Sequence, residues 1–464
     1  MNFFFPIEWI NRELESRLLL TISLLAQSKN KKIKIYLGNQ KKLGKITEKF
    51  NNYYLWLATG VQGELEFYKR LFKNKGVIAS LDEEGGIFTK NDNKILPRHE
   101  IQHEYAHLVS KIFIWGNEEA RKIKKKYKRN KKNSLVVTGN PRFDLAKQKF
   151  NIYFNNPKFK KDVLINTAFS MKNPDVDHQK EKLFWNSRAV SKKWGKTTYN
   201  DNFDNTVKYQ TKNFKLFLKD IKRLAEKYNN LTFGIRSHPS ESKEIYKNYF
   251  KNLKNIEIMD NSHSVLYNIF NSNVIIHPGC TSAVEAFFSG KKTICHITYR
   301  DKGNEQYVPV KVSDLSRNFN QLENLFYNHL KKNKVDKKKD NGSKIFLSNH
   351  IFNLSLDSYK IIAKELLKID IKNENLEMIK EVRKLKENLV SSFLWRIKKK
   401  ITNLLLKKKI NHINKLIKKR EKRKFNKLEV QMLKNKFKKL AKIENFKKKI
   451  SIKKIGNQCF LISK

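Results

Sequence analysis

The sequence predicts an α/β protein with two domains, each built on a parallel β-sheet, and three observations support this prediction. Short apolar runs that end near glycine alternate with helical stretches, first within residues 1–150 and again within 151–330. Such alternation is typical of parallel sheets whose strands are joined by helices. The chain has 464 residues, enough for about two to four domains. Hydrophobic residues make up 39% of it, so both domains can bury a substantial core.

The N-terminal domain, residues 1–150, is expected to begin with a helix at 8–28, where leucines cluster on one side. Apolar runs that we interpret as strands with their following turns lie at 32–38, 55–60, 76–86, 111–117 and 134–144. Ligands of parallel sheets bind beyond the carboxyl ends of the strands. The polar residues that follow these runs are therefore the candidates for a functional site.

The second domain, residues 151–330, repeats this pattern around a polar insertion near 170–210. The periodicity predicts strands at 163–169, 231–239 and 255–260, a helix at 214–230, and a strand–helix–strand unit at 272–297. Two Rossmann-like domains of this kind would face each other across a cleft.

Residues 331–464 are predicted to form a basic helical extension that ends in a small β-hairpin at 448–462. From residue 372 onward there are 31 basic and 7 acidic residues, a net charge of +24. Apolar residues recur at helical spacing among the lysines. This pattern is consistent with a solvated helical hairpin or with a basic amphipathic helix on an anionic membrane surface.

The net charge of +55, from 99 Lys and Arg against 44 Asp and Glu, predicts anionic partners: phosphates, nucleic acid or an anionic membrane. The three cysteines, Cys280, Cys295 and Cys459, are too few for a disulfide framework or a cysteine-rich zinc site. No apolar run could span a bilayer, and the N-terminus lacks the basic stretch of a secretory signal. We therefore expect a cytoplasmic protein, either free or peripheral on the inner face of the cytoplasmic membrane.

Three carboxylates, Asp82, Glu83 and Glu84, follow an expected strand and precede Gly85. Crowded carboxylates raise one another's pKa, which suits a general base or acid. An acidic surface turn would show the same pattern. The motif by itself leaves both interpretations open.

A second cluster, with Arg236, His238 and Pro239, follows the strand expected from residue 231. Pro239 forces His238 into an extended conformation, which projects the imidazole beyond the strand beside Arg236. An arginine and a histidine at a strand end suit a phosphate. The alternative is a turn before a helix, with Ser240 as its N-cap.

A third cluster leads from His277 through Gly279 and Thr281 to a predicted helix that begins near Ser282. Ser282 and Glu285 have the S-x-x-E spacing of a capping box, which we expect to form. Helix N-termini with free N–H groups also bind phosphates. Capping and phosphate binding are compatible here, because several N–H donors remain.

Asn140 and Arg142 follow a further expected strand and are placed on the same side as the other clusters. Neither a G-x-G-x-x-G nor a G-x-x-x-x-G-K-[ST] motif is present. This argues against NAD or ATP chemistry, and no cofactor is expected.

The pattern H-E-x-x-H at His99, Glu100 and His103, extended by His107, matches a zinc-protease helix. The segment is short, and the third ligand that this class of protease requires is absent at its spacing. We therefore interpret it as an exposed polar helix of about three turns and predict no metal site.

Taken together, the clusters resemble a family. Glu83-Glu84-Gly85, His238-Pro239 and Thr281-Ser282 resemble, in this order, the D/E-D/E-G, H-P and Ser/Thr motifs of bacterial sialyltransferases and CMP-Kdo-using transferases. The segments WINRELESRLLL, IFIWGN, VVTGNPRFD and RSHPSE also resemble bacterial surface-carbohydrate biosynthesis proteins. The resemblance covers residues 5–310.

The resemblance implies a GT-B glycosyltransferase with a CMP-activated nonulosonic acid or Kdo as donor, and a surface glycan or its lipid-linked precursor as acceptor. Glu83 or an acidic neighbour would deprotonate the acceptor hydroxyl. His238 would stabilise the departing CMP phosphate, which Thr281 and Ser282 would hold from the helix N-terminus. The third acid of the motif and a second His-Pro pair, at His277, leave the base and the phosphate histidine open. The candidate catalytic residues are thus Asp82, Glu83, Glu84 and His238, and the candidate substrate-binding residues are Gly85, Asn140, Arg142, Arg236, Pro239, Ser240, His277, Gly279, Thr281, Ser282 and Glu285.

Two other functions stay open. The R-x-H-P element at 236–239 also resembles the CDP-glycerol polymerases, which would make the donor CDP-glycerol. The charge alone is compatible with a nucleic-acid-binding protein, although no RRM, KH, zinc-finger or helix-turn-helix pattern is present.

Overall fold

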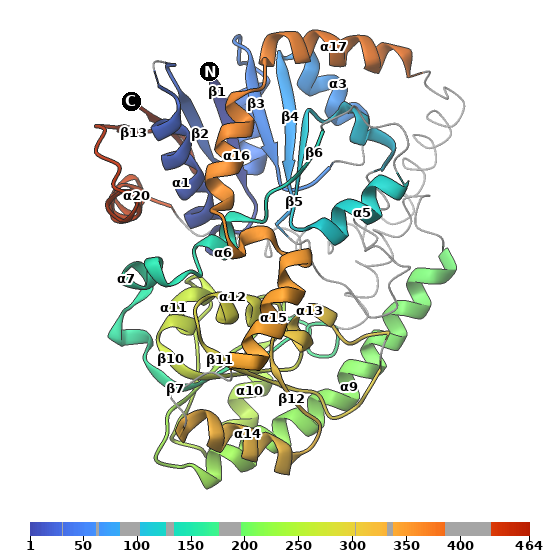
Figure 1. The fold of residues 1–464 in the computed structure, drawn as a ribbon, viewed down its shortest axis with the longest axis vertical. Helices are drawn as coiled ribbons and strands as arrows, with labels where there is room; N and C mark the ends of the chain where they lie inside the picture. The colour runs from blue at the N-terminus through green and yellow to red at the C-terminus, as the bar shows by residue number, and fades with distance from the viewer. Residues whose placement is uncertain are drawn as a thin grey trace, which may run out of the picture.

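The structure, a computed structural model, describes residues 1–29, 31–61, 65–83, 103–126, 134–175, 196–301, 303–331, 337–385 and 428–464. These residues form two α/β domains, one above the other in Figure 1, each with helices packed around one β-sheet. The predicted fold class, two Rossmann-like domains in the GT-B arrangement, is confirmed. Among the described helices, none combines the length and the apolarity that a bilayer span requires.

The sheet of the N-terminal domain has eight strands in the order β13-β14-β2-β1-β3-β4-β5-β6. Six of them, which are parallel, are β1 (Asn2–Ile7), β2 (Lys34–Asn39), β3 (Tyr54–Ala58), β4 (Gly76–Leu81), β5 (Lys111–Ile114) and β6 (Leu135–Val137). The hairpin of β13 (Ser451–Gly456) and β14 (Cys459–Ser463) adds to the edge of this sheet, because β14 pairs antiparallel with β2.

The central strand β1 was not predicted. Phe3, Phe4 and Phe5 are all fully buried, so the strand lacks the alternation of apolar and polar residues that marks a half-exposed strand. It also contains Pro6, which has no N–H to donate. Pairing of β1 with β3 ends at Phe4, so Pro6 lies beyond that ladder.

The second sheet has six parallel strands in the order β12-β11-β10-β7-β8-β9. They are β7 (Lys161–Asn166), β8 (Phe233–Arg236), β9 (Ile256–Ile258), β10 (Ser272–His277), β11 (Lys292–His296) and β12 (Asp314–Ser316). The chain runs from β7 toward β9 on one side and then returns to build β10, β11 and β12 on the other. The sheet therefore reverses its strand order between β7 and β10, where open α/β sheets bind ligands.

Helices connect the strands of both domains. The helix expected at 8–28 is present as α1, and the one expected at 214–230 is the second half of a longer helix, α9. The connecting helices are α1 (Ile10–Gln27), α2 (Gln40–Thr47), α3 (Leu65–Lys73), η1 (His103–Leu108), α5 (Asn117–Lys126), α6 (Pro141–Asp144), η2 (Gln148–Phe150), α7 (Asn151–Phe154), η3 (Pro157–Phe159), α9 (Lys196–Lys227), α10 (Lys243–Phe250), α11 (Val265–Phe270), α12 (Ser282–Phe288), α13 (Tyr307–Lys311) and α14 (Phe319–Lys331).

After the second sheet the chain returns to the first domain (Figure 1). It does so through α15 (Lys337–His350), η4 (Phe352–Leu354), α16 (Ser358–Leu367) and α17 (Ile371–Lys384). α16 packs on α1, and so does α20 (Val430–Ile443), whose Leu433, Phe437 and Leu440 are buried. Of the predicted basic extension, residues 386–427 lie outside the described residues. α15 packs on α5 of the first domain and α13 of the second, whereas α16, α17 and α20 pack on the N-terminal domain.

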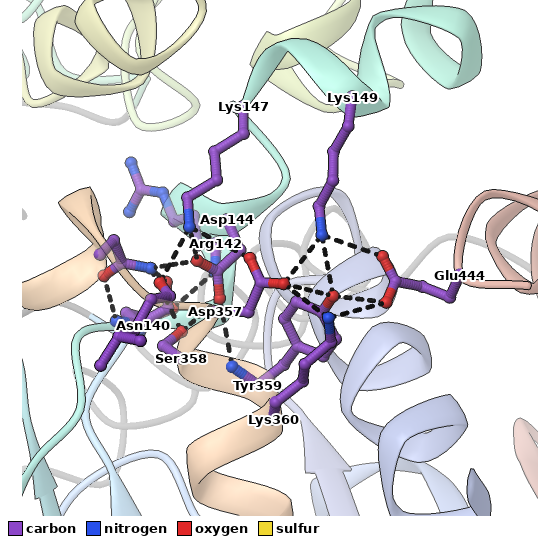
Figure 2. A network of polar contacts seen from close by, with 12 residues as sticks. Asn140, Arg142, Asp144, Lys147, Lys149, Asp357, Ser358, Tyr359, Lys360 and Glu444 are labelled. Atoms are coloured by element: carbon purple, nitrogen blue, oxygen red, sulfur yellow. Dashed lines mark hydrogen bonds and ion pairs between the residues drawn. The ribbon is translucent and has the colours of Figure 1, made fainter.

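A network of polar contacts joins the end of the N-terminal domain to these returning helices (Figure 2). The buried carboxylate of Asp144 accepts hydrogen bonds from Asn353 Nδ2 at 2.7 Å and Ser358 Oγ at 2.5 Å. Lys149 lies 3.1 Å from Glu444 at the end of α20. The loop that leaves the first domain is therefore held by two segments that follow the second domain.

Candidate active site

The acidic motif begins where β4 ends, and neighbouring strands fix its backbone. The carbonyl oxygen of Asp82 accepts hydrogen bonds from Trp115 Nε1 at 2.7 Å and from Asn140 Nδ2 at 2.9 Å. Trp115 follows β5 and Asn140 follows β6. The carboxyl ends of three successive strands are thus tied together at one point.

Glu83 is fully buried at this point. Its Oε1 lies 3.2 Å from Nη2 of Arg17 on α1, and its Oε2 accepts a hydrogen bond from Asn140 Nδ2 at 3.3 Å. Burial raises the pKa of Glu83; the charge of Arg17 opposes this shift, and that of Glu13 adds to it. A carboxylate with a raised pKa is suited to proton transfer near neutral pH.

The turn after β6 is shaped by Gly139, whose φ is +77°. A Cβ at this position would lie 1.9 Å from Oδ1 of Asn353, so no side chain fits. Asn140 then begins α6, because its side chain accepts a hydrogen bond from the Arg142 amide at 2.8 Å. The turn aims Arg142 toward the second domain.

Arg142 forms an ion pair with Glu285 on α12, across the two domains. Nε lies 2.8 Å from Oε1 and Nη2 lies 3.1 Å from Oε2, a two-pronged geometry. Burial alone would lower the pKa of Arg142, but the pairing with Glu285 raises it. These two residues, predicted to bind substrate, are bound to each other in the structure.

The turn after β10 is built around His277, which is fully buried. Its Nδ1 accepts hydrogen bonds from the amides of Gly279 at 3.0 Å and Cys280 at 3.1 Å, and its Nε2 lies 2.9 Å from Ser313 Oγ. Burial lowers the pKa of His277 to about 3, so the ring is neutral. Because Nδ1 is bonded to the turn and Nε2 to Ser313 after α13, His277 shapes the loop that leads to Thr281.

The predicted capping box between Ser282 and Glu285 is wrong. α12 begins with Thr281 as N-cap and without a side-chain capping bond. The Ser282 hydroxyl instead accepts a hydrogen bond from Asn166 Nδ2 at 3.0 Å, and Glu285 pairs with Arg142. Tertiary partners at the domain boundary take both side chains away from the local motif.

His238 lies on the turn after β8 and is exposed, as is Pro239. Its amide donates to Thr167 Oγ1 at 3.3 Å, and its Nδ1 accepts from the amide of Ser240 at 3.2 Å. In a neutral ring this places the proton on Nε2. His238 is therefore set up as a hydrogen-bond donor.

The buried side chain of Glu241 supports this turn from inside the domain. Its buried carboxylate accepts hydrogen bonds from the Phe169 amide at 2.5 Å, Thr167 Oγ1 at 2.6 Å and the Tyr246 hydroxyl at 2.5 Å. Burial raises the pKa of Glu241 to about 7. Through Thr167, the carboxylate fixes the backbone of His238.

Arg236 is buried and turns into the domain. Its guanidinium donates to Asn268 Oδ1 at 2.9 Å and to the carbonyl of His263 at 2.7 Å. Burial lowers the pKa of Arg236 to about 10. These contacts anchor the segment between β9 and α11, rather than pairing Arg236 with His238 at one phosphate.

The order of the second sheet brings the clusters together. β7 lies between β10 and β8, so Asn166 at its end contacts Ser282, and Thr167 contacts His238. From the other domain, Glu83 is linked through Asn140 to the turn of Arg142, which pairs with Glu285 one helical turn after Ser282. Polar contacts, joined by two short stretches of chain (Ser282 to Glu285 and Asn166 to Thr167), thus connect the acidic motif to the histidine turn.

The start of α1 reaches the same region. Asn11 Nδ2 donates to the carbonyl of Asn261 at 2.6 Å, and Asn261 Nδ2 donates to the carbonyl of Ser237 at 2.8 Å. Residues before His238 are thereby tied to the N-terminal domain by a second route.

No role was predicted for Arg17, Asn166, Thr167 or Glu241. Arg17 carries a detectable signal, because it is a charged residue flanked by apolar positions within a helix that must pack on a sheet. Asn166 and Thr167 end an expected strand and could have been found by the same rule that selected Asn140.

Glu84 and Gly85, together with His99 and Glu100, lie outside the described residues. His103 begins the 3₁₀ helix η1, so the described part of the expected polar helix is not α-helical. Within the part of the chain that the structure describes, no group of three or more His, Cys, Asp or Glu side chains could hold a metal ion.

No protein-family model matches the chain, and a comparison with curated proteins finds no match. Similar solved structures include UDP-GlcNAc 2-epimerase from Neisseria meningitidis bound to UDP-GlcNAc, which is 14% identical over 80% of this chain and 100% of that one, with a TM-score of 0.49. A putative UDP-N-acetylglucosamine 2-epimerase from Listeria monocytogenes is 10% identical over 79% and 94%, with a TM-score of 0.49. The wall teichoic acid polymerase TagF is 10% identical over 80% and 89%, with a TM-score of 0.48. Identities this low say nothing about the reaction of this chain.

Proposed function

We propose that this chain is a glycosyltransferase that moves an acidic sugar, a nonulosonic acid or Kdo, from a CMP-activated donor to a surface glycan or its lipid-linked precursor. The observation that carries the proposal is the path of contacts from Glu83 to His238 through the Arg142–Glu285 pair. It supports a single site at the carboxyl ends of two parallel sheets, which is where enzymes of this architecture bind their ligands.

In the proposed reaction, a bond forms between the acceptor hydroxyl oxygen and the anomeric carbon of the sugar, and the bond between that carbon and the phosphate oxygen of CMP breaks. The hydroxyl proton passes to a carboxylate of the acidic motif, Asp82, Glu83 or Glu84. The bonding electron pair leaves with CMP. His238 donates a hydrogen bond from Nε2 to the phosphate and stabilises the charge that develops there. In this proposal, the hydroxyl of Thr281 holds the same phosphate.

The test is release of CMP from CMP-N-acetylneuraminic acid and from CMP-Kdo in the presence of lipid-linked glycan acceptors. We expect His238→Ala and Glu83→Ala to lose at least about 100-fold in rate, since each removes a transition-state interaction or a proton acceptor. Glu244→Ala, at an exposed glutamate of α10, is the matched control and should keep full activity. Unchanged CMP release in both site variants would rule out the assignment.

A donor panel separates the CMP-sugar proposal from other nucleotide donors. Thermal unfolding is measured with CMP, CDP, CDP-glycerol and UDP at equal concentration, since a ligand that binds only the folded protein raises its midpoint. Stabilisation by CMP supports the proposal. Stabilisation by CDP and CDP-glycerol without CMP would favour a CDP-glycerol transferase.

We further propose that the basic residues of 372–464 place the enzyme on the inner face of the cytoplasmic membrane, beside a lipid-linked acceptor. The net charge of +24 in this stretch supports attraction to anionic lipid. Co-sedimentation with vesicles that contain phosphatidylglycerol should fall steeply between about 0.05 and about 0.5 M salt, because such attraction is screened over this range. Steeply salt-dependent binding to RNA or DNA, with an affinity comparable to that of specific nucleic-acid-binding proteins, would instead favour a nucleic-acid-binding protein.

A further inference from the structure

Helix α1 carries a charged side chain that is completely buried. Among the largest fully buried side chains of the described residues, Arg17 is the one that bears a charge; the others are aromatic. It sits on a helix whose neighbouring positions, Leu14 and Leu18, are part of the hydrophobic core. The guanidinium is therefore removed from water at a position where the helical pattern would favour an apolar residue.

The partner of Arg17 is a carboxylate of the acidic motif. Nη2 lies 3.2 Å from Oε1 of Glu83, and both side chains are withdrawn from solvent. Taking two charges out of water is costly, and an apolar pair of similar volume would usually stabilise a fold as well or better. A buried ion pair at the end of a central strand is therefore better explained by the function of that strand end.

We propose that Arg17 is the positioning residue of the acidic motif: its guanidinium lies against the Glu83 carboxylate at the end of β4 and favours the ionised form of that carboxylate. The inference rests on the proposed function, in which this motif accepts the proton of the acceptor hydroxyl. Arg17 holds one oxygen of Glu83, and Asn140 donates to the other. The carboxylate thus lies between α1 and the turn after β6, with an ion pair on one side and a hydrogen bond on the other; the contact with Arg17 is an ion pair without a hydrogen bond.

The charges around Glu83 explain why a cation is needed on α1. Glu13, one turn before Arg17, accepts hydrogen bonds from the amides of Glu8 and Trp9 at 2.8 and 3.1 Å and forms an ion pair with Arg12 at 2.9 Å. Burial of Glu83 and the negative charge of Glu13 both raise the pKa of Glu83, while Arg17 lowers it most, followed by Arg12 on the same helix and Arg142 after β6.

Arg142 cannot substitute for Arg17. Its guanidinium is engaged with both oxygens of Glu285 on α12, so its charge is largely balanced. Arg17 is thus the cation in direct contact with Glu83, and its removal leaves a buried carboxylate beside Glu13.

The first test is the pH profile of CMP release by the full chain carrying Arg17→Met or Arg17→Lys. Without the cation, the acidic limb of the profile, where the rate rises with pH as the carboxylate loses its proton, should move to higher pH in Arg17→Met. The rate at low pH should then fall about tenfold for every pH unit that the limb moves and should recover at high pH. Arg17→Lys keeps the charge, so its limb should move less. Arg70→Met removes an arginine from an exposed pair with Glu48 in the same domain and is the matched control.

The second test does not need the donor and therefore separates failure of this inference from failure of the proposed function. Thermal unfolding is followed from pH 5 to pH 8. Arg17→Met should be far less stable than the unchanged protein at pH 8, and the difference should shrink at pH 5, where protonation of Glu83 removes the unpaired charge. Adding Glu83→Gln to Arg17→Met should restore stability at pH 8.

The two tests distinguish failure of this inference from failure of the proposed function. The inference would be overturned if Arg17→Met lowered the rate equally at every pH without moving the acidic limb of the profile. It would also be overturned if the loss of stability in Arg17→Met were the same at pH 5 and pH 8 and were not relieved by Glu83→Gln. If Arg17→Met does not fold at pH 8 but folds at pH 5 or together with Glu83→Gln, the inference is supported. If no CMP-sugar is turned over by the unchanged protein, the proposed function fails, while the unfolding series still decides whether Arg17 favours the ionised form of Glu83.

Discussion

The ion pair between Arg142 and Glu285 should be the strongest single polar contact between the two domains, and its energy can be measured by a double-mutant cycle. The two side chains are 13% and 3% exposed and meet through two short contacts. The variants are Arg142→Met, Glu285→Leu and the double substitution. Each single change leaves one charge buried without its partner, whereas the double change removes both.

The expected magnitudes follow from this burial. Removing one partner of a buried, hydrogen-bonded pair costs about 3–5 kcal/mol; the remaining exposure of Arg142 places the cost of Glu285→Leu near the lower bound. Replacing both partners by apolar side chains of similar volume is often nearly neutral. The double variant should therefore be more stable than either single variant. The coupling free energy, which is the summed cost of the two single changes minus the cost of the double change, should be at least about 6 kcal/mol, above the range of about 0.5–3 kcal/mol that is usual for contacting residues.

The assay is urea unfolding at pH 7, with the free energy of unfolding taken from the midpoint and slope. CMP release by the same variants reports whether the pair aligns the two domains for the reaction. Arg317→Met is the matched control, because the Arg317–Glu305 pair lies within the second domain; it should cost stability without changing the KM for the donor. Two results would refute the reasoning: single changes that each cost less than about 1 kcal/mol, or a double change whose cost equals their sum.

Three further predictions concern positions that support the site. Burial raises the pKa of Glu241 to about 7, so the folded state binds this proton more tightly than the unfolded chain. The free energy of unfolding should therefore fall as the pH rises from about 4.5 through 7. Glu241→Gln should remove this fall, which amounts to up to about 3 kcal/mol, in unfolding measurements at pH 5 and pH 8. Phe460→Ala should cost about 3–5 kcal/mol in urea unfolding, since Phe460 on β14 is fully buried; a cost below about 1 kcal/mol would mean that the hairpin is not part of the core. Asn353→Ala should cost about 1–3 kcal/mol, because its side chain bonds both the amide and the carbonyl of Asn140, and it should slow CMP release by displacing that turn; an unchanged rate would separate the turn from the site.

Much of the fold was predictable because strand ends and helices leave local marks. The apolar runs before Asp82, Asn140 and His238 each form a strand as expected, because a buried parallel strand must be apolar and the turn after it polar. β1 was not predicted because its short apolar run contains Pro6, which is uncommon within strands. The hairpin at the C-terminus was visible from its local pattern, but its pairing with β2 was not.

The sequence by itself determined which residues stand at strand ends, because periodicity and turn residues act over a few positions of the chain. Only the tertiary structure decided what those residues contact. The spacing of Ser282 and Glu285 favours a capping box, yet Asn166 and Arg142 reach them from other elements. Arg17 stands within a predicted helix, but its burial against Glu83 depends on how α1 packs on the sheet. Electrostatic and hydrogen-bond energies depend on distance and on exclusion of water, and these are set by contacts between segments far apart in sequence.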